Sequence, residues 1–155
     1  MKKIAAFVLA VIIACFTLVA LADEYFIICN PESYVCVRRS PRKGGIEEGR
    51  LEIGEKVQTD GKKRNGFVHC VSLSTEWGEG WVYRGYLTDT KPVIQKCKAT
   101  VAANGRVACR RNVKGKVQKW VRPCTDVTVY ALNDEWAVTN KGFIRTMYLE
   151  VWYEN

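Results

Sequence analysis

Apolar and polar residues alternate over short stretches of this chain, and beyond residue 22 no long stretch repeats its apolar residues with a helical period. Runs rich in Val, Ile, Tyr, Phe and Trp are separated instead by Gly, Pro, Asn and Asp. Because successive side chains of a strand point to opposite faces, such runs predict half-buried β-strands. The runs are YFIIC, YVCVR, LEI, KVQT, GFVHCVS and GWVY, then VAC, VQKWV, VTVYAL, EWAVT, GFIR and EVWY. The pattern predicts an all-β protein built from small barrels or sandwiches.

The second half of the chain repeats the first. Four blocks recur in the same order: RRS (38–40) as RRN (110–112), LEIGEKVQT (51–59) as VRPCTDVTV (121–129), NGFV (65–68) as DEWAV (134–138), and GWVYRGYL (80–87) as GFIRTMYL (142–149). A chain that repeats its blocks in order is expected to fold as two similar units. We therefore predict one domain over residues 23–91 and a second over residues 92–155, joined at the TDTKP segment.

Residues 1–22 predict a secretory signal peptide. Two lysines precede a long apolar run, and the run ends on ALA (20–22), a small-x-small cleavage site. An uncleaved membrane anchor is one alternative, but the polar Asp23 directly after the site favours removal. Lipidation at Cys15 is a second alternative, which the continuing apolar run disfavours. We expect an exported protein, secreted or periplasmic, with no membrane span after cleavage.

Six cysteines follow the predicted leader, an even number in a chain destined for an oxidising compartment. We expect disulfides, in a pairing that the sequence leaves open, among Cys29, Cys36, Cys70, Cys97, Cys109 and Cys124. In units this small, bridges worth about 2–4 kcal/mol each would matter for stability. A metal site is not expected, because there is no C-x2-C pair and His69 is the only histidine. A catalytic thiol is not expected either, since His69 and Cys70 are neighbours on a predicted strand.

Four blocks of the first unit resemble the bacterial SH3 domain. They are VCVRRSP (35–41), LEIGEKV (51–57), NGFV (65–68) and GWVYRGYL (80–87). The second unit is similar but more divergent, because it lacks the Ser-Pro pair and has Cys124 where the middle block has glycine. Together the matches span nearly all of the chain after the predicted leader.

The resemblance implies an all-β fold class, with two small SH3-like barrels in tandem after a cleaved signal peptide, and a short 3₁₀ turn at each closing Tyr-Leu. It also implies a non-catalytic targeting module of the kind that tethers exported proteins to peptidoglycan or to peptides. Such modules usually accompany a catalytic domain. We recognise no sequence for one here, which leaves binding as the expected activity.

Positive charge is concentrated in the second unit. Residues 23–91 carry 11 Lys and Arg against 11 Asp and Glu, whereas residues 92–155 carry 11 against 5. Between residues 106 and 122 lie seven basic residues and no acid. Such a run either attracts an anionic partner or is simply a solvated face. Nucleic acid would also fit basic residues with aromatics among them, but export argues against it. Anionic wall polymers or peptidoglycan carboxylates fit the compartment better.

The candidate ligand-binding residues are Arg38, Arg39, Trp77, Tyr83, Arg110, Arg111, Lys114 and Trp120. The four arginines end the first strand of each unit, where the resemblance places the long loop that borders the ligand groove. Trp77 lies in a Gly-rich polar loop, and Tyr83 precedes the closing turn. Lys114 and Trp120 belong to the basic run. Other large aromatics are expected in the core, namely Phe67, Trp81, Trp136 and Phe143.

Two functions follow from this pattern. The first is an exported, non-catalytic module that binds cell-envelope material, either peptidoglycan or an anionic wall polymer. The alternative is a secreted adaptor or inhibitor, in which a groove edged by Trp77 and Tyr83 takes a peptide or protein partner. The chain has no G-x-S-x-G elbow and no phosphate-binding G-x-x-x-x-G-K loop. We therefore expect neither catalysis nor a cofactor.

Overall fold

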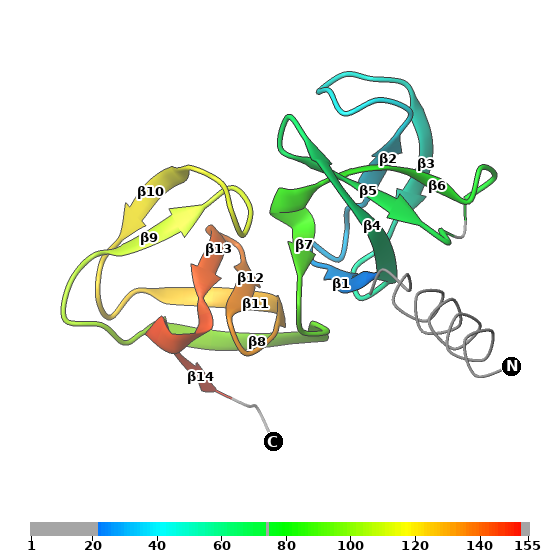
Figure 1. The fold of residues 1–155 in the computed structure, drawn as a ribbon. Coiled ribbons are helices and arrows are strands. Elements are labelled where there is room, and N and C mark those ends of the chain that lie inside the picture. The colour runs from blue at the N-terminus through cyan, green and yellow to red at the C-terminus, as the bar shows by residue number, and fades with distance from the viewer. Residues whose placement is uncertain (1–21, 74, 153–155) are drawn as a thin grey trace, which may run out of the picture.

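The computed structural model describes residues 22–73 and 75–152, which form two seven-stranded antiparallel sheets (Figure 1). The first sheet contains β1 (Asp23–Ile27), β2 (Val35–Arg38), β3 (Glu47–Leu51), β4 (Lys56–Arg64), β5 (Phe67–Val71), β6 (Glu79–Tyr83) and β7 (Leu87–Thr88). The second contains β8 (Val93–Val101), β9 (Val107–Arg110), β10 (Val117–Val121), β11 (Asp126–Leu132), β12 (Trp136–Thr139), β13 (Gly142–Arg145) and β14 (Leu149–Trp152). We call residues 23–88 the first unit and 93–152 the second. The predicted signal peptide, with Cys15, lies outside the described residues.

The two sheets have the same topology. The strand order is β3-β2-β6-β5-β4-β1-β7 in the first and β10-β9-β13-β12-β11-β8-β14 in the second, so each strand has a counterpart in the same place. A 3₁₀ turn precedes the last strand of each unit, at Arg84–Tyr86 and at Thr146–Tyr148. The predicted fold class, all-β with two small barrel-like units in tandem, is therefore confirmed.

The repeat extends to single backbone hydrogen bonds. Gly54 donates its N–H to the carbonyl of Ile27, and Cys124 donates its N–H to the carbonyl of Val101, both at 2.8 Å. Both donors have left-handed backbones, with φ of 82° at Gly54 and 57° at Cys124. Glycine adopts this conformation freely, whereas a residue with a side chain pays about 1–2 kcal/mol. Cys124 thus keeps the backbone of the repeat although its side chain is unfavourable there.

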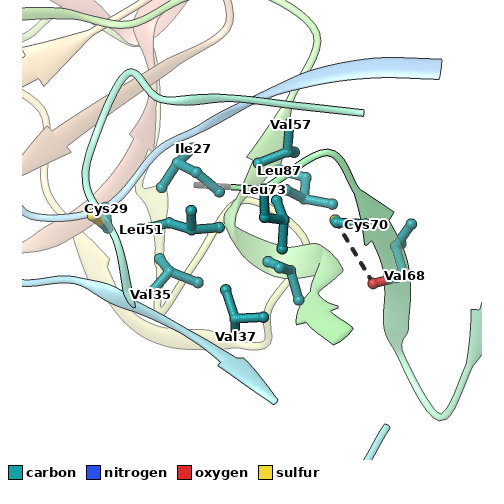
Figure 2. Close-up of a cluster of buried hydrophobic side chains, with 11 residues drawn as sticks. Ile27, Cys29, Val35, Val37, Leu51, Val57, Val68, Cys70, Leu73 and Leu87 are labelled. Atoms are coloured by element: carbon teal, nitrogen blue, oxygen red, sulfur yellow. Dashed lines mark hydrogen bonds between the residues drawn. The ribbon is translucent and has the colours of Figure 1, made fainter. Parts of the chain in front are cut away.

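Each unit closes around its own apolar core, as the alternating pattern predicts. Val35 and Val37 of β2 are buried, while Cys36 and Arg38 between and after them are only partly covered. The core of the first unit, shown in Figure 2, consists of Ile27, Cys29, Val35, Val37, Leu51, Val57, Val68, Cys70, Leu73, Val82 and Leu87. The core of the second consists of Ala99, Val101, Val107, Cys109, Val121, Val127, Val129, Ala137 and Ile144.

A third apolar cluster joins the two units. It contains Ile28 of the first unit together with Val113, Ala131, Trp136, Val138 and Phe143 of the second, and Ile53 of the first packs against it. Trp136 and Phe143 lie on the outer face of the second sheet. Their positions correspond to Phe67 and Trp81, because β12 pairs with β13 and β13 with β9, as β5 pairs with β6 and β6 with β2. At equivalent positions, Phe143 is therefore buried in this cluster whereas Trp81 is only partly buried.

Hydrogen bonds reinforce this junction. The Asn133 side chain donates from Nδ2 to Thr88 Oγ1 at 2.9 Å and to the carbonyl of Thr90 at 3.0 Å. The N–H of Val113 donates to the carbonyl of Gly85 at 3.0 Å. Asn133 is only 6% exposed, so its amide is held in a site where losing a partner would leave a buried polar group unsatisfied. In Figure 1 the loop that follows β9 accordingly lies close to the turn before β7.

The expected burial of the large aromatics is confirmed at three positions and wrong at the fourth. Phe67, Trp136 and Phe143 are each at most 6% exposed. Trp81 is only partly buried. It lies on the outer face of the sheet, where its ring tilts against that of His69 with 5.0 Å between centroids. Phe143, at the equivalent position, is buried in the cluster that contains Ile28, whereas Trp81 is not a member of that cluster.

The predicted disulfide framework is not formed in this structure. All six described cysteines are free: Cys29, Cys36, Cys70, Cys97, Cys109 and Cys124. The placement of four of them keeps two of the possible pairs apart. Cys36 is on the outer face of β2 and Cys70 points into the first core, whereas Cys97 and Cys109 are on strands that three other strands separate. A bridge needs two Cα atoms within about 7 Å and converging Cβ vectors.

Burial should make two of these thiols inert in the folded protein. Burial, with the nearby Glu52 and Glu55 carboxylates, raises the pKa of Cys29 to about 11. Burial, with Asp60, raises the pKa of Cys70 to about 12. The thiolate is the reactive form, so brief alkylation near neutral pH should label exposed Cys124 and spare both. Peptide mass mapping measures this, with labelling in guanidinium as the control. Equal labelling of Cys70 and Cys124 in the folded protein would contradict it.

Candidate functional site

The outer face of the first sheet carries a continuous row of aromatic rings. Phe67 of β5 pairs with Tyr83 of β6, and Trp81 of β6 pairs with Arg38 of β2. The Phe67 and Tyr83 rings meet edge to face with centroids 5.4 Å apart, and Tyr83 meets Tyr86 in the same way at 6.1 Å. Such arrangements are favourable for aromatic pairs. The three rings form a floor at the end of the sheet that faces the second unit.

A groove of about 730 Å³ lies over this floor. It is lined by Tyr34, Val35, Cys36, Arg38, Pro41, Arg42, Lys43, Asn65, Phe67, Tyr83, Tyr86, Arg111 and Asn112. Residues 41–43 come from the loop after β2, whereas Arg111 and Asn112 come from the second unit. The docking of the two units therefore completes the groove. We call it the junction groove.

The charged side chains of the junction groove are all basic. Arg38, Arg42, Lys43 and Arg111 line it, and no described carboxylate does. Arg38 is held in place, because its Nη1 donates to the carbonyl of Gly45 at 2.6 Å. Within residues 22–73 and 75–152, Arg42, Lys43 and Arg111 form no ion pair. The groove thus presents unneutralised positive charge above an aromatic floor.

Two titratable groups of the groove are held in their neutral forms. Burial raises the pKa of the Tyr86 phenol, and the positive charge of Arg111 opposes that shift in part. Burial and a hydrogen bond to Glu47 raise the pKa of the Cys36 thiol, whose Sγ donates to Glu47 Oε2 at 3.0 Å. Tyr86 is thus a neutral hydroxyl near physiological pH, and Cys36 is a thiol rather than a nucleophilic thiolate.

A second, smaller pocket of about 420 Å³ lies in the second unit. It is lined by Ala103, Asn104, Gly105, Arg106, Val107, Ala108, Arg110, Trp120, Arg145 and Tyr148. We call it the Trp120 pocket. Several of its residues occupy the repeat positions of groove residues, since Arg110 corresponds to Arg38 and Tyr148 to Tyr86.

The structure divides the sequence-predicted site residues into three groups. Arg38, Tyr83 and Arg111 line the junction groove. Arg110 and Trp120 line the Trp120 pocket, so the consecutive residues Arg110 and Arg111 serve different sites. The remaining three, Arg39, Trp77 and Lys114, line neither of these pockets.

A local ion pair accounts for one of the three residues outside both pockets, and the other two are exposed on loops. Arg39 turns away from the groove to pair with Glu48, with Nε and Oε1 2.5 Å apart. Trp77 lies in the loop between β5 and β6 and is 59% exposed. Lys114 is exposed on the loop between β9 and β10. The structure does not, therefore, place Trp77 and Tyr83 at the edge of one groove.

Sequence reasoning missed several lining residues. Tyr86 belongs to the closing block of the repeat, and Arg42 and Lys43 form a basic pair in the loop that the resemblance associated with the ligand groove. These signals were available in the sequence. Asn112 was visible only as a repeat position, because its place in the groove depends on how the second unit docks on the first.

His69 pairs with a carboxylate, on the face opposite to the cysteine that follows it in the sequence. His69 Nδ1 lies 3.0 Å from Asp60 Oδ2, and its neighbour Cys70 points to the opposite face, into the core. Within the described ranges no three His, Cys, Asp or Glu side chains are grouped as metal ligands. No helix in the same ranges is long and apolar enough to span a bilayer.

No protein-family model and no curated protein matches this chain. Among solved structures it is similar to NlpC1 and NlpC2 from Trichomonas vaginalis, each at 15% identity and a TM-score of 0.32. The similarity covers 86% of this chain, 46% of NlpC1 and 48% of NlpC2, so the chain spans about half the length of those proteins. At this distance the two proteins say nothing of what the chain binds. Membership of the bacterial SH3 family stays a prediction.

Proposed function

We propose that this protein is an exported, non-catalytic binding module that holds an anionic segment of cell-envelope material, peptidoglycan or an anionic wall polymer, in the junction groove. One observation carries the proposal: the groove combines an aromatic floor with four basic side chains and no described carboxylate. Its volume is in the usual range for small-molecule and peptide sites.

The chemistry of the groove matches a ligand with an apolar body and a negative group. The half-buried rings of Tyr83, which packs against the buried Phe67, and of Tyr86 offer ring surface to the apolar part. Arg38 has one nitrogen committed to Gly45, which leaves the other donors of its guanidinium for a carboxylate or phosphate. Arg111 faces the same space from the second unit. A ligand that touches both is held by the two units together.

We propose a non-catalytic role because of the states of the Cys36 thiol and of His69. The Cys36 thiol in the groove is kept protonated by burial and by Glu47, and its pKa is raised. His69 is not among the residues that line the groove, and it pairs with Asp60. A thiol nucleophile is activated by a lowered pKa, whereas the pKa of the Cys36 thiol is raised although Glu47 lies within hydrogen-bond reach of its Sγ.

A protein partner is the second candidate. The exposed side chain of Trp77, 59% accessible on its loop, favours it. An exposed tryptophan of this kind commonly anchors a protein interface. In that case Trp77→Ala would abolish capture of a discrete partner, and capture would persist in high salt.

The first test is cosedimentation of residues 23–155 with purified sacculi at low and high salt. Binding through exposed guanidinium and ammonium groups should weaken steeply as salt rises. The double variant Arg42→Glu with Lys43→Glu reverses two groove charges, and it should weaken binding about tenfold or more at low salt. Lys63→Glu with Lys96→Glu changes the net charge equally, at exposed residues outside both pockets, and should bind nearly as wild type.

Two outcomes would reject the proposal. One is an equal loss of binding in both double variants, which would assign retention to net charge rather than to the groove. The other is a lack of sedimentation at either salt concentration, which would favour the protein partner.

A further inference from the structure

Trp120 marks one difference between the Trp120 pocket and the corresponding part of the first unit. In the first unit Cys36 of β2 pairs with Arg50 of β3, and in the second Ala108 of β9 pairs with Trp120 of β10. Trp120 therefore occupies the position of Arg50. The two pockets lie at related places in the repeat, but they present different groups to a ligand.

Arg50 contacts a carboxylate and an aromatic ring of its own unit. Its Nε lies 2.7 Å from Glu47 Oε1, and its guanidinium carbon lies 4.1 Å from the centre of the Tyr34 ring. Trp120, by contrast, is 59% exposed and pairs across the strands with the small Ala108. An indole of this size is usually covered in a small domain. Its exposure at a pocket leaves a flat apolar face available to a ligand.

Guanidinium groups surround this indole. Arg106, Arg110 and Arg145 line the same pocket, and no described carboxylate lines it. Arg110 donates from Nη1 to the carbonyl of Gly115 at 2.8 Å, as Arg38 does to Gly45. Arg145 is fixed by Glu135 and stacks over the Trp136 ring at 4.4 Å. Arg106 is exposed and forms no ion pair within the described residues, which leaves it free to meet an anion.

We propose that the Trp120 pocket is a separate binding site for an acidic saccharide unit. A pyranose ring has an apolar C–H face and a polar edge. The face packs on Trp120, while a carboxylate on the sugar is bound by Arg106 and Arg110. The pocket, at about 420 Å³, has room for one or two sugar rings. An extended peptide has no comparable flat face, which is why the geometry favours a sugar.

Two sites on one rigid pair of units make the protein bivalent toward envelope polymer. Arg110 serves the Trp120 pocket and Arg111 serves the junction groove. The apolar cluster around Trp136 fixes the units relative to each other. Binding at the first site then raises the effective concentration at the second. This bivalency rests on the proposed function of the junction groove, whereas the saccharide site itself does not.

The test is an NMR titration of residues 23–155 with N-acetylmuramic acid, an amino sugar that bears a carboxylate. Two further probes separate its parts: N-acetylglucosamine has the ring without the carboxylate, and lactate has the carboxylate without the ring. We expect the indole N–H signal of Trp120 to shift with the acidic sugar and much less with either part. Trp120→Ala should weaken binding about tenfold, and Arg106→Glu should weaken it similarly. Trp77→Ala removes an equally exposed tryptophan and should change nothing.

Three outcomes would overturn the saccharide site. Equal shifts with lactate would make it an anion site only, and equal shifts with N-acetylglucosamine would remove the role of the arginines. Shifts at Trp120 with an acidic peptide but not with the sugar would assign it to a protein ligand. The Arg42→Glu, Lys43→Glu variant separates the two proposals, because it should weaken sacculus binding while keeping this titration. If sacculus binding fails and the titration succeeds, only the function proposed for the junction groove is rejected.

Discussion

Replacing Trp136 by Ala should lower the free energy of unfolding by about 3–5 kcal/mol, the cost of removing a large buried aromatic side chain. Trp136 is 4% exposed and lies in the cluster that joins the units, where Ile28 of the first unit is also fully buried. Because the junction is lost with the ring, one cooperative transition should become two. Differential scanning calorimetry and denaturant unfolding measure both effects.

The control for this prediction is Trp152→Ala. Trp152 is 54% exposed at the end of β14, so its removal should change stability by about 0.5 kcal/mol or less. Ile28→Ala tests the junction from the other unit, and should lower the stability of the second unit although Ile28 precedes it in the chain. A single transition with unchanged midpoint in Trp136→Ala would show that the two units do not stabilise each other.

Replacing Gly85 by Ala should separate the units at a second point and weaken the junction groove. An added Cβ would lie 2.4 Å from Asn112 Oδ1 and 2.6 Å from Tyr83 Cε1, closer than such contacts permit. The added Cβ overlaps both Asn112 and the Tyr83 ring, so both overlaps have to be relieved, and both residues line the groove. Overpacking of this kind costs about 1–3 kcal/mol. We expect lower stability together with weaker sacculus binding.

Met147 provides the matched control for Gly85. It holds the same place in the 3₁₀ turn of the second unit but is 77% exposed, with no facing unit. Met147→Ala should leave both stability and binding nearly unchanged. If Gly85→Ala kept wild-type binding while losing stability, the second unit would not contribute to the groove, and Arg111→Glu should then also bind as wild type.

The internal repeat is the part of the fold that sequence reasoning predicted best. Matching blocks such as GWVYRGYL and GFIRTMYL correspond to strands β6 and β13 with the turns that follow them. Alternation within YVCVR predicted a half-buried strand, and in β2 Val35 and Val37 are buried while Arg38 is only partly covered. These features depend on neighbours within a few residues, so they are recorded in the order of the side chains.

The number of cysteines in the sequence does not show which of them can form disulfides. An even number in a predicted exported chain favoured disulfides, yet a bridge depends on the distance and direction between two side chains. Cys36 and Cys70 face opposite sides of the first sheet, and Cys97 and Cys109 are separated by three strands. Sequence separation carries no information on either quantity.

The sequence by itself determined the all-β class, the two related units and the surplus of positive charge in the second. The tertiary structure alone decided which outer face is open. Trp81 and Phe143 occupy equivalent positions, but Phe143 is buried in the cluster that contains Ile28 while Trp81 is only partly buried. The tertiary structure also places the consecutive residues Arg110 and Arg111 in different pockets. The physical reason is that local pattern sets which face a side chain takes, whereas the docking of one unit on another sets what that face meets.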